Sequence, residues 1–161
     1  MLNGFMRIRL AKLAACFAVC FAAAAAGSLY ITPAMESGWY DALAKPSFTP
    51  PNWVFAPAWI LLYALMAMSL YLISEVQSEE KTVAYAAFLA QLALNVAWSM
   101  VFFGIHNPDF ALIIIIALEA TLLAAIAFSR KASLPAALLL VPYALWIAFA
   151  AVLNYYVAIL N

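Results

Sequence analysis

Hydrophobic positions run along this chain in five long blocks, and within each block they are continuous rather than alternating. The blocks cover residues 10–30, 53–73, 83–103, 110–128 and 134–160. A helix needs about 20 residues to cross a hydrocarbon core of ~30 Å. Continuous runs disfavour a β-barrel, in which lipid-facing and interior residues alternate. Because backbone amides in lipid need partners within the segment, the pattern predicts five transmembrane α-helices.

Composition narrows the fold class further. Of the 161 residues, 70% are hydrophobic and 9% are charged, whereas about 25% of a soluble domain is charged. Too few charges remain to build a surface that faces water on all sides. We therefore expect one all-α integral membrane domain over residues 1–161: a five-helix transmembrane bundle with a long folded loop, residues 31–52, between its first and second helices.

The charges are distributed unevenly along the chain. If the spans alternate in direction, six basic residues fall on one side of the membrane, and these are Arg7, Arg9, Lys12, Lys81, Arg130 and Lys131. Only Lys45 falls on the other side. The positive-inside rule then predicts a cytoplasmic N-terminus in a bacterial cell membrane, with an outer or mitochondrial membrane as open alternatives. So few basic residues predict no nucleic acid partner.

The first block has a second interpretation. Its basic start, its apolar stretch and the run from Ala22 to Ala26 before Gly27 also fit a secretory signal peptide with a small-residue cleavage site. Cleavage would leave four spans. Cys16 and Cys20 lie four residues apart in this block, a poor geometry for a disulfide within one helix. We expect them to be packing residues, and no spacing in the chain predicts a metal site.

Residues 31–52 are rich in proline and aromatic residues. Disordered segments are poor in aromatics, so this loop is expected to fold, with a short helix that Ser37 caps and Pro46 ends. It would close a site between the helices as a lid. The predicted lid residues are Trp39, Asp41, Lys45, Pro46, Phe48, Pro50, Pro51 and Trp53. For Trp39 and Trp53 taken singly, anchoring in the lipid interface is an alternative.

Helical projection places large aromatics and neutral polar groups on shared faces of three spans. The faces comprise Trp59, Tyr63 and Met66; Gln91, Asn95, Trp98 and Phe102; and Tyr143, Trp146, Ala150 and Asn154. Polar residues within a span usually face the bundle interior. The three faces therefore predict an aromatic-lined cavity for a flat apolar ligand. Alternatively, Gln91 and Asn95 act only as hydrogen-bonding links between helices.

Two further residues bear chemistry outside these faces. Glu119 lies within the fourth span without a basic residue at the same depth, which makes it a candidate for ligand or proton handling. His106 is the only histidine and lies in the short turn after the third span. A single histidine in a loop is expected to be solvated rather than to bind metal or haem.

Three sequence motifs carry a family resemblance. The first is WYDALAKPSFTPP from Trp39 to Pro51, followed by Trp53, Phe55 and Trp59. The second is NVAWS from Asn95, followed by Phe102, Phe103 and Gly104, and the third is PYALWIAFA from Pro142, leading to Leu153 and Asn154. In order and spacing they resemble the TspO/MBR family, which includes the tryptophan-rich sensory proteins of bacteria and the mitochondrial translocator protein, also known as the peripheral-type benzodiazepine receptor.

The resemblance implies a five-helix bundle, often a homodimer, that binds porphyrins such as protoporphyrin IX. It also implies binding of isoquinoline carboxamide and benzodiazepine drugs. Carried over by motif, the pocket residues are Tyr40, Trp59, Asn95, Trp98, Tyr143, Trp146 and Ala150. No cofactor is required, because the porphyrin is a ligand. The resemblance also favours an uncleaved first span, since the family uses it as a wall of the bundle.

Three functions follow as alternatives. The first is a membrane receptor or sensor for porphyrins and similar flat ligands. The second is an enzyme that degrades protoporphyrin IX in light, for which the resemblance implicates Trp59 and Trp146. The third is a porphyrin or lipid transporter, although no convincing inverted repeat is present. Cholesterol binding is doubtful, because no basic residue follows Tyr155 and Tyr156 where the animal motif has one.

Overall fold

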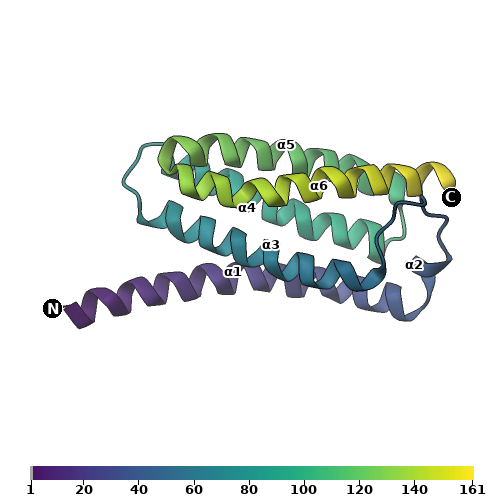
Figure 1. Ribbon diagram of the computed structural model, residues 1–161, viewed down its shortest axis with the longest axis horizontal. Helices are drawn as coiled ribbons and strands as arrows, with labels where there is room; N and C mark the ends of the chain where they lie inside the picture. The colour runs from purple at the N-terminus through teal and green to yellow at the C-terminus, as the bar shows by residue number, and fades with distance from the viewer. Residues whose placement is uncertain (1) are drawn as a thin grey trace.

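A computed structural model describes residues 2–161 as a bundle of long helices that lie side by side (Figure 1). The long helices are α1 (Leu2–Glu36), α3 (Asn52–Glu75), α4 (Lys81–Ser99), α5 (Pro108–Ala132) and α6 (Leu134–Leu160), joined by the short α2 (Trp39–Ala42) and the π-helical η1 (Met100–Gly104). Five segments are long and apolar enough to cross a membrane, with η1 continuing the span of α4. The predicted all-α, five-helix membrane fold is confirmed.

The long helices form a closed ring in the order α1, α3, α6, α5, α4 and back to α1. The odd number of spans leaves the described ends of the chain at opposite ends of the bundle, and the first turns of α1 extend beyond the other helices (Figure 1). Large, fully buried side chains, such as Met66, Phe88 and Leu140, fill the core between the long helices. α1 packs beside α3 and α4 as a wall of the bundle.

The connection between the first two spans is shorter than predicted. α1 continues to Glu36 with Pro33 inside it, so the loop begins at residue 37 rather than 31. Gly38 ends α1 with a left-handed φ of 75°, and its amide donates to the Met35 carbonyl at 3.1 Å. This is a conformation that glycine adopts without strain at helix ends.

The short helix in the loop also differs from the prediction. It covers only Trp39–Ala42, and Gly38 rather than Ser37 holds its capping position. The Ser37 hydroxyl donates to the Ala34 carbonyl of α1 at 3.1 Å, and its oxygen also accepts a hydrogen bond from the Trp39 amide of the short helix at 3.4 Å. The helix ends before Pro46 because Leu43 is already extended, with ψ at 139°.

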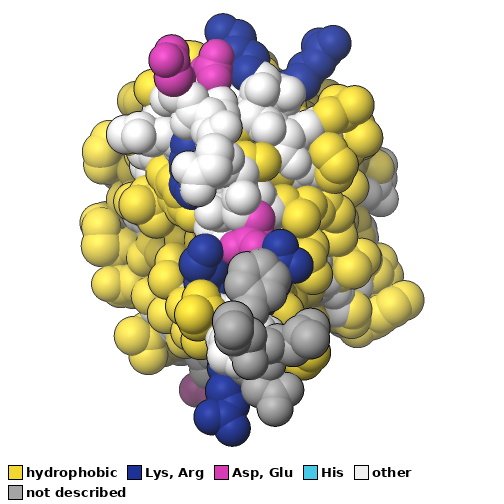
Figure 2. All heavy atoms as spheres, turned by 90° about the vertical axis from the view of Figure 1, so that its left-hand side faces the viewer, with side chains coloured by type: hydrophobic (Ala, Val, Ile, Leu, Met, Phe, Trp, Pro, Cys, Tyr) yellow, Lys and Arg dark blue, Asp and Glu magenta, His cyan; other side chains and the backbone are white. Residues whose placement is uncertain are grey.

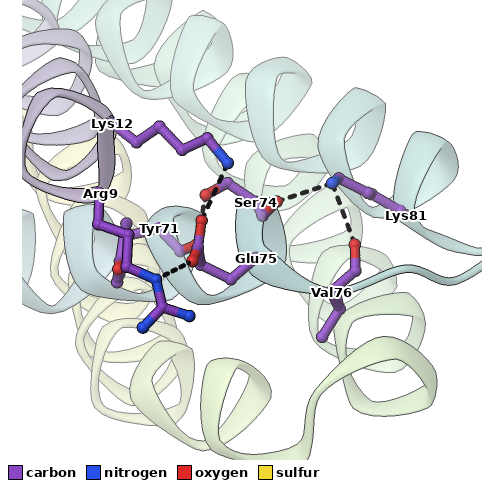
Figure 3. Close-up of polar contacts among 7 residues, drawn as sticks. All are labelled: Arg9, Lys12, Tyr71, Ser74, Glu75, Val76 and Lys81. Carbon is purple, nitrogen blue, oxygen red and sulfur yellow. Dashed lines mark hydrogen bonds and ion pairs between the residues drawn. The ribbon is translucent and has the colours of Figure 1, made fainter. Parts of the chain in front are cut away.

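Most of the basic residues, together with Glu75, Glu79 and Glu80, lie at the end of the bundle where α1 begins. In Figure 2, which looks at this end, basic and acidic side chains lie among polar groups while hydrophobic side chains cover the flanks. Glu75, the last residue of α3, pairs with Arg9 at 3.1 Å and Lys12 at 3.0 Å on α1 (Figure 3). Lys81 donates to the carbonyls of Ser74 and Val76 at 2.7 and 3.0 Å. A charged end and apolar flanks are the surface that a bilayer-spanning bundle requires.

Candidate functional site

A cavity of about 450 Å³ lies between α1, α3, α4 with η1, and α6, in the half of the bundle that is nearer the loop. Its volume falls within the range of about 300–1,000 Å³ that is typical of small-molecule sites. The wall is mostly hydrophobic, and its polar side chains are neutral: Ser28, Tyr40, Asn52, Tyr63, Asn95, Trp98, Ser99, Trp59, Trp146 and Asn154. The site therefore suits an apolar molecule with a few hydrogen-bonding groups.

Nine of the eleven residues that the sequence places at a ligand site line this cavity. They are Tyr40, Trp59, Tyr63, Asn95, Trp98, Phe102, Trp146, Ala150 and Asn154. They come from the loop and from three different spans, so the three aromatic faces do converge. The other two residues, Gln91 and Tyr143, lie elsewhere in the interior.

Gln91 and Tyr143 face the interior as predicted, but they lie at a different level along the bundle from the cavity. Both are fully buried, so both face the interior as expected. They lie on the side of the cavity that is farther from the loop, which we call its floor. Tyr143 supports this floor, because its hydroxyl accepts a hydrogen bond from Asn95 Nδ2 at 2.7 Å. Gln91 Nε2 lies 3.9 Å from the sulfur of Met66. Helical spacing identifies the inward face but not the level at which packed core gives way to open space.

Asn95 links the floor of the cavity across three spans. Its Oδ1 accepts a hydrogen bond from the Tyr63 hydroxyl at 2.7 Å, while its Nδ2 donates to Tyr143. Asn95 is only 2% exposed. A buried polar chain of this kind fixes the relative positions of α3, α4 and α6 because each unmade bond would be costly in an apolar interior.

Two indoles stand on one side of the cavity and contact each other. The rings of Trp59 and Trp146 lie 6.5 Å apart, edge to face at 84°. Phe55 meets Trp146 at 5.9 Å, and Trp59 also lies 5.6 Å from the Tyr63 ring. Edge-to-face packing is a favourable arrangement for aromatic rings, so α3 and α6 together present a continuous aromatic wall.

The third indole is fixed by a hydrogen bond. Trp98 Nε1 donates to Asn154 Oδ1 at 2.9 Å, and Asn154 Nδ2 donates onward to the Pro108 carbonyl at the start of α5. The Trp98 ring stacks against Phe102 at 5.3 Å. These contacts hold the indole of Trp98 in one orientation on the wall opposite α3.

The π-helical turn η1 brings two consecutive aromatics to the cavity, since Phe102 and Phe103 both line it. The Ile105 amide donates to the Met100 carbonyl at 2.9 Å, the spacing of a π-turn. Such turns occur frequently at functional sites. Gly104 allows α1 to approach here, because an added Cβ would lie 2.7 Å from the Tyr30 ring.

None of the eight predicted lid residues lines the cavity, whereas Tyr40 of α2 and Asn52, the first residue of α3, do. The lid residues instead hold the loop together. Asp41 accepts from the Asn52 side chain at 3.0 Å, and Lys45 donates to the carbonyls of Tyr40 and Asp41. Thr49 donates to the Pro46 carbonyl.

The remaining lid residues lie at the loop surface or against other elements. Trp39 stacks on His106 at 4.1 Å, and Phe48 meets Tyr156 of α6 at 5.4 Å. Pro51 precedes α3, Pro50 is half-buried, and Trp53 is 75% exposed. The loop is also joined to the end of α6, where the Asn161 side chain exchanges two hydrogen bonds of 3.0 Å with the backbone of Ala44.

Tyr40 connects the loop to the cavity. It is the buried residue of α2, and burial, reinforced by the neighbouring Asp41 carboxylate, raises the pKa of its phenol. The Lys45 ammonium lies 4.5 Å from the centre of the Tyr40 ring. The raised pKa keeps the phenol neutral at physiological pH, and Tyr40 lines the loop end of the cavity.

The wall that α1 contributes was missed by the sequence analysis. It comprises Phe21, Ala24, Gly27, Ser28, Ile31 and Met35. The small residues at 24, 27 and 28 leave space, which a stripe of aromatics does not signal. Along the seam between α1 and α3 the cavity is incompletely enclosed, because the lining residues Phe21 and Ile60 are 37% and 61% exposed.

Glu119 and His106 lie outside the cavity lining. Glu119 is half-buried in α5, and its Oε2 is buried without a hydrogen-bond partner among residues 2–161. His106 is exposed, with a φ of 58°, and stacks on Trp39. His106 is thus solvent-exposed, as expected, and its ring contact with Trp39 also joins it to the loop.

Comparison with known proteins agrees with this architecture. The model of the TspO/MBR family matches residues 16–160. The chain is 41% identical over 150 residues to the tryptophan-rich protein TspO of Archaeoglobus fulgidus, covering 93% of this chain and 97% of that protein. It is 40% identical over 158 residues to the TspO protein of Chlorobaculum tepidum, covering 97% and 99% of the two chains.

An animal protein is also similar. The translocator protein of Ovis aries is 43% identical over 121 residues, covering 73% of this chain and 71% of that protein. The match to the family model, residues 16–160, reaches all five spans and includes the loop that joins the first two. This chain is therefore an integral membrane protein that belongs to the TspO/MBR family.

Proposed function

We propose that this protein is a membrane receptor or sensor that binds porphyrins, such as protoporphyrin IX, and similar flat apolar molecules in the cavity between its helices. The observation that carries the proposal is the convergence of Trp59, Trp98 and Trp146 on one apolar cavity of about 450 Å³. Aromatic rings stack favourably on flat conjugated systems. The names of relatives, such as the tryptophan-rich sensory protein of Cereibacter sphaeroides, support a sensory role.

The cavity chemistry fits a porphyrin in two ways. Its hydrophobic wall matches the macrocycle, and no charged side chain in residues 2–161 lines it, so a neutral ring system is accommodated without desolvating a charge. The carboxyl groups of a porphyrin would need donors, and Tyr40 and Asn52 lie at the loop end of the cavity. No metal is needed for binding of this kind.

Tryptophan fluorescence tests the proposal directly. Protoporphyrin IX titrated into the detergent-solubilised protein should quench the emission in a saturable manner. Trp59→Ala combined with Trp146→Ala should weaken the binding, as should Trp98→Ala. Trp53→Ala is the matched control, because Trp53 is 75% exposed and lies outside the cavity. Unchanged affinity in the Trp59/Trp146 variant would remove the cavity assignment.

A second candidate function is light-dependent oxidation of the bound porphyrin. It is favoured by the position of Trp59 and Trp146, whose rings are 6.5 Å apart and line the same cavity. An illuminated porphyrin passes its excitation to dioxygen, and dioxygen is then reduced as the macrocycle is oxidised. Indoles are readily oxidised groups that can react in the same process.

Illumination with product analysis separates this enzyme from a binding protein. The porphyrin should be converted to defined products with the protein, light and air, and Trp59→Phe with Trp146→Phe should reduce the rate while preserving a stacked ring. Bleaching at equal rates with and without the protein would reject catalysis and leave the receptor proposal standing.

We also propose that the charged end of the bundle, where Arg9 and Lys12 pair with Glu75, faces the cytoplasm. The positive-inside distribution of Arg and Lys supports this orientation. Single cysteines introduced at Ser78 and at Ser47, in a variant without Cys16 and Cys20, would test it with a membrane-impermeant thiol reagent. Labelling of intact cells at Ser78 rather than Ser47 would contradict the orientation.

A further inference from the structure

A second hollow lies on the outer surface of the bundle, between α3 and α6. This α3–α6 groove has a volume of about 440 Å³. It is lined by Ala58, Leu61 and Leu62 of α3 and by Pro142, Leu145, Trp146 and Phe149 of α6. All seven lining side chains are hydrophobic, and the groove is separate from the cavity inside the bundle except for one residue.

That residue is Trp146, which lines both the cavity and the α3–α6 groove. Its ring contacts Trp59 on the cavity side and Phe149, at 6.0 Å, on the groove side. Among residues 2–161 the interactions of Trp146 are ring contacts, whereas Trp98 is also held by a hydrogen bond to Asn154. The Trp146 indole therefore separates the cavity from the groove, and a molecule bound on either side would contact the same ring.

The depth of the groove indicates what covers it. Leu62 and Leu145 lie ten and eleven residues from the starts of α3 and α6, which is about 15 Å along a helix. That distance is half the thickness of a hydrocarbon core of ~30 Å. Leu61 and Leu145 are 60% and 69% exposed at the rim, while Leu62 is 5% exposed at the floor. The groove is thus open to the middle of the bilayer.

The rim argues for a lipid chain rather than another helix. Helices that associate in membranes approach through small residues, and here the exposed leucines 61 and 145 project on either side of the hollow. A thin, flexible hydrocarbon chain can enter between them. Pro142, which also lines the groove, lies one turn before Trp146 and removes a backbone hydrogen bond from α6.

We propose that the α3–α6 groove binds an acyl chain of a membrane lipid against the outer face of Trp146, and that this lipid and the ligand in the cavity influence each other's binding through the shared indole. The second part rests on the proposed function, because it needs a ligand in the cavity. By linkage, a ligand that shifts Trp146 changes the affinity for the lipid chain, and the lipid changes the affinity for the ligand by the same factor.

The lipid contact is tested without any cavity ligand. Wild-type protein and Trp146→Phe are reconstituted in phosphatidylcholine vesicles whose acyl chains carry bromine near the middle. The wild type should lose more fluorescence to bromine than the variant, and the difference is the Trp146-dependent quenching. Ala58→Phe, which fills the groove, should reduce that quenching, and Ala117→Phe on the exposed face of α5 is the matched control.

The coupling is tested by titrating protoporphyrin IX into the same variants. Ala58→Phe should change the dissociation constant of protoporphyrin IX by about five-fold, which is the lower end of the couplings typically measured between two sites. Ala117→Phe should leave this constant unchanged. If Ala58→Phe does not fold, Leu61→Phe at the rim replaces it in both measurements. Failure of porphyrin to bind any variant would overturn the proposed function but leave the quenching result intact.

Some outcomes would overturn the lipid site, and another would remove only the coupling. Trp146-dependent quenching that is absent, or that Ala58→Phe leaves unchanged, would show that no chain reaches the indole through the groove. Quenching that appears only when the protein is diluted in excess lipid would show that a second copy of the chain covers the groove. A porphyrin affinity that responds equally to Ala58→Phe and Ala117→Phe would remove the coupling.

Discussion

Replacement of Asn95 by leucine tests the polar link beneath the cavity. The change keeps the side-chain size but removes an acceptor for the Tyr63 hydroxyl and a donor to the Tyr143 hydroxyl, each at 2.7 Å. Measured hydrogen bonds between membrane helices average about 0.6 kcal/mol and reach about 1.7 kcal/mol. Two such bonds at a residue that is 2% exposed predict a loss of about 1 to 3 kcal/mol in the free energy of unfolding.

The assay is reversible unfolding in mixed micelles, followed by circular dichroism. A cycle with Tyr63→Phe and Tyr143→Phe provides the control, because each tyrosine variant should be costly with Asn95 present and nearly neutral with leucine in its place. Because Asn95 also lines the cavity, Asn95→Leu should weaken porphyrin binding as well. Equal stability of Asn95→Leu and wild type, or additive effects throughout the cycle, would refute the reasoning.

Three further predictions concern the cavity walls and the loop. Gly104→Ala should destabilise the protein by about 1 to 3 kcal/mol, because the new Cβ would lie 2.7 Å from the Tyr30 ring; the additional change Tyr30→Leu should recover much of the loss in a thermal melt. Trp98→Phe should weaken ligand binding and lower stability by about 1 kcal/mol by losing the 2.9 Å bond to Asn154, whereas a variant as stable as wild type would contradict this role. Burial raises the pKa of Tyr40 above its ordinary value of 10.0, so its contribution to stability is complete below pH 10 and is lost as the pH rises above it; Tyr40→Phe should flatten the unfolding profile at high pH, and an unchanged slope would contradict the assignment.

Hydropathy was sufficient to predict the spanning helices, because lipid leaves a chain few other ways to satisfy its backbone. The boundaries were less accurate where local chemistry decides them. α1 continues through Pro33 to Glu36, and the loop is correspondingly shorter. The end of α1 is set by the left-handed conformation of Gly38, whereas the predicted boundary followed the end of the hydrophobic block.

The sequence predicted which helix faces point toward the candidate site, but not how far the cavity extends along them. The polar residues Asn95 and Asn154 correctly marked the inward faces of their helices. Gln91 and Tyr143 share those faces but lie in packed core, because helical spacing contains no information on where cavities end. The wall formed by α1 was missed because its small residues contribute space rather than contacts.

The π-turn at η1 was equally invisible to a helical projection. An α-helical wheel assumes a constant angle per residue, and this turn changes the angle at Phe102 and Phe103. The loop motif predicted a folded segment, which the structure has, but its shape depends on contacts with α6 and with the turn after η1, which lie far away in the sequence. Phe48 with Tyr156, and Trp39 with His106, are examples.

The central claim is that indoles from separate helices form one ligand cavity within the bundle. A crystal structure grown from lipidic mesophase with protoporphyrin IX tests it most directly. The account predicts the macrocycle between α1, α3, α4 and α6, in contact with the rings of Trp59, Trp98 and Trp146. A porphyrin bound elsewhere, with these rings directed into the acyl chains and side chains filling the space between the helices, would contradict it.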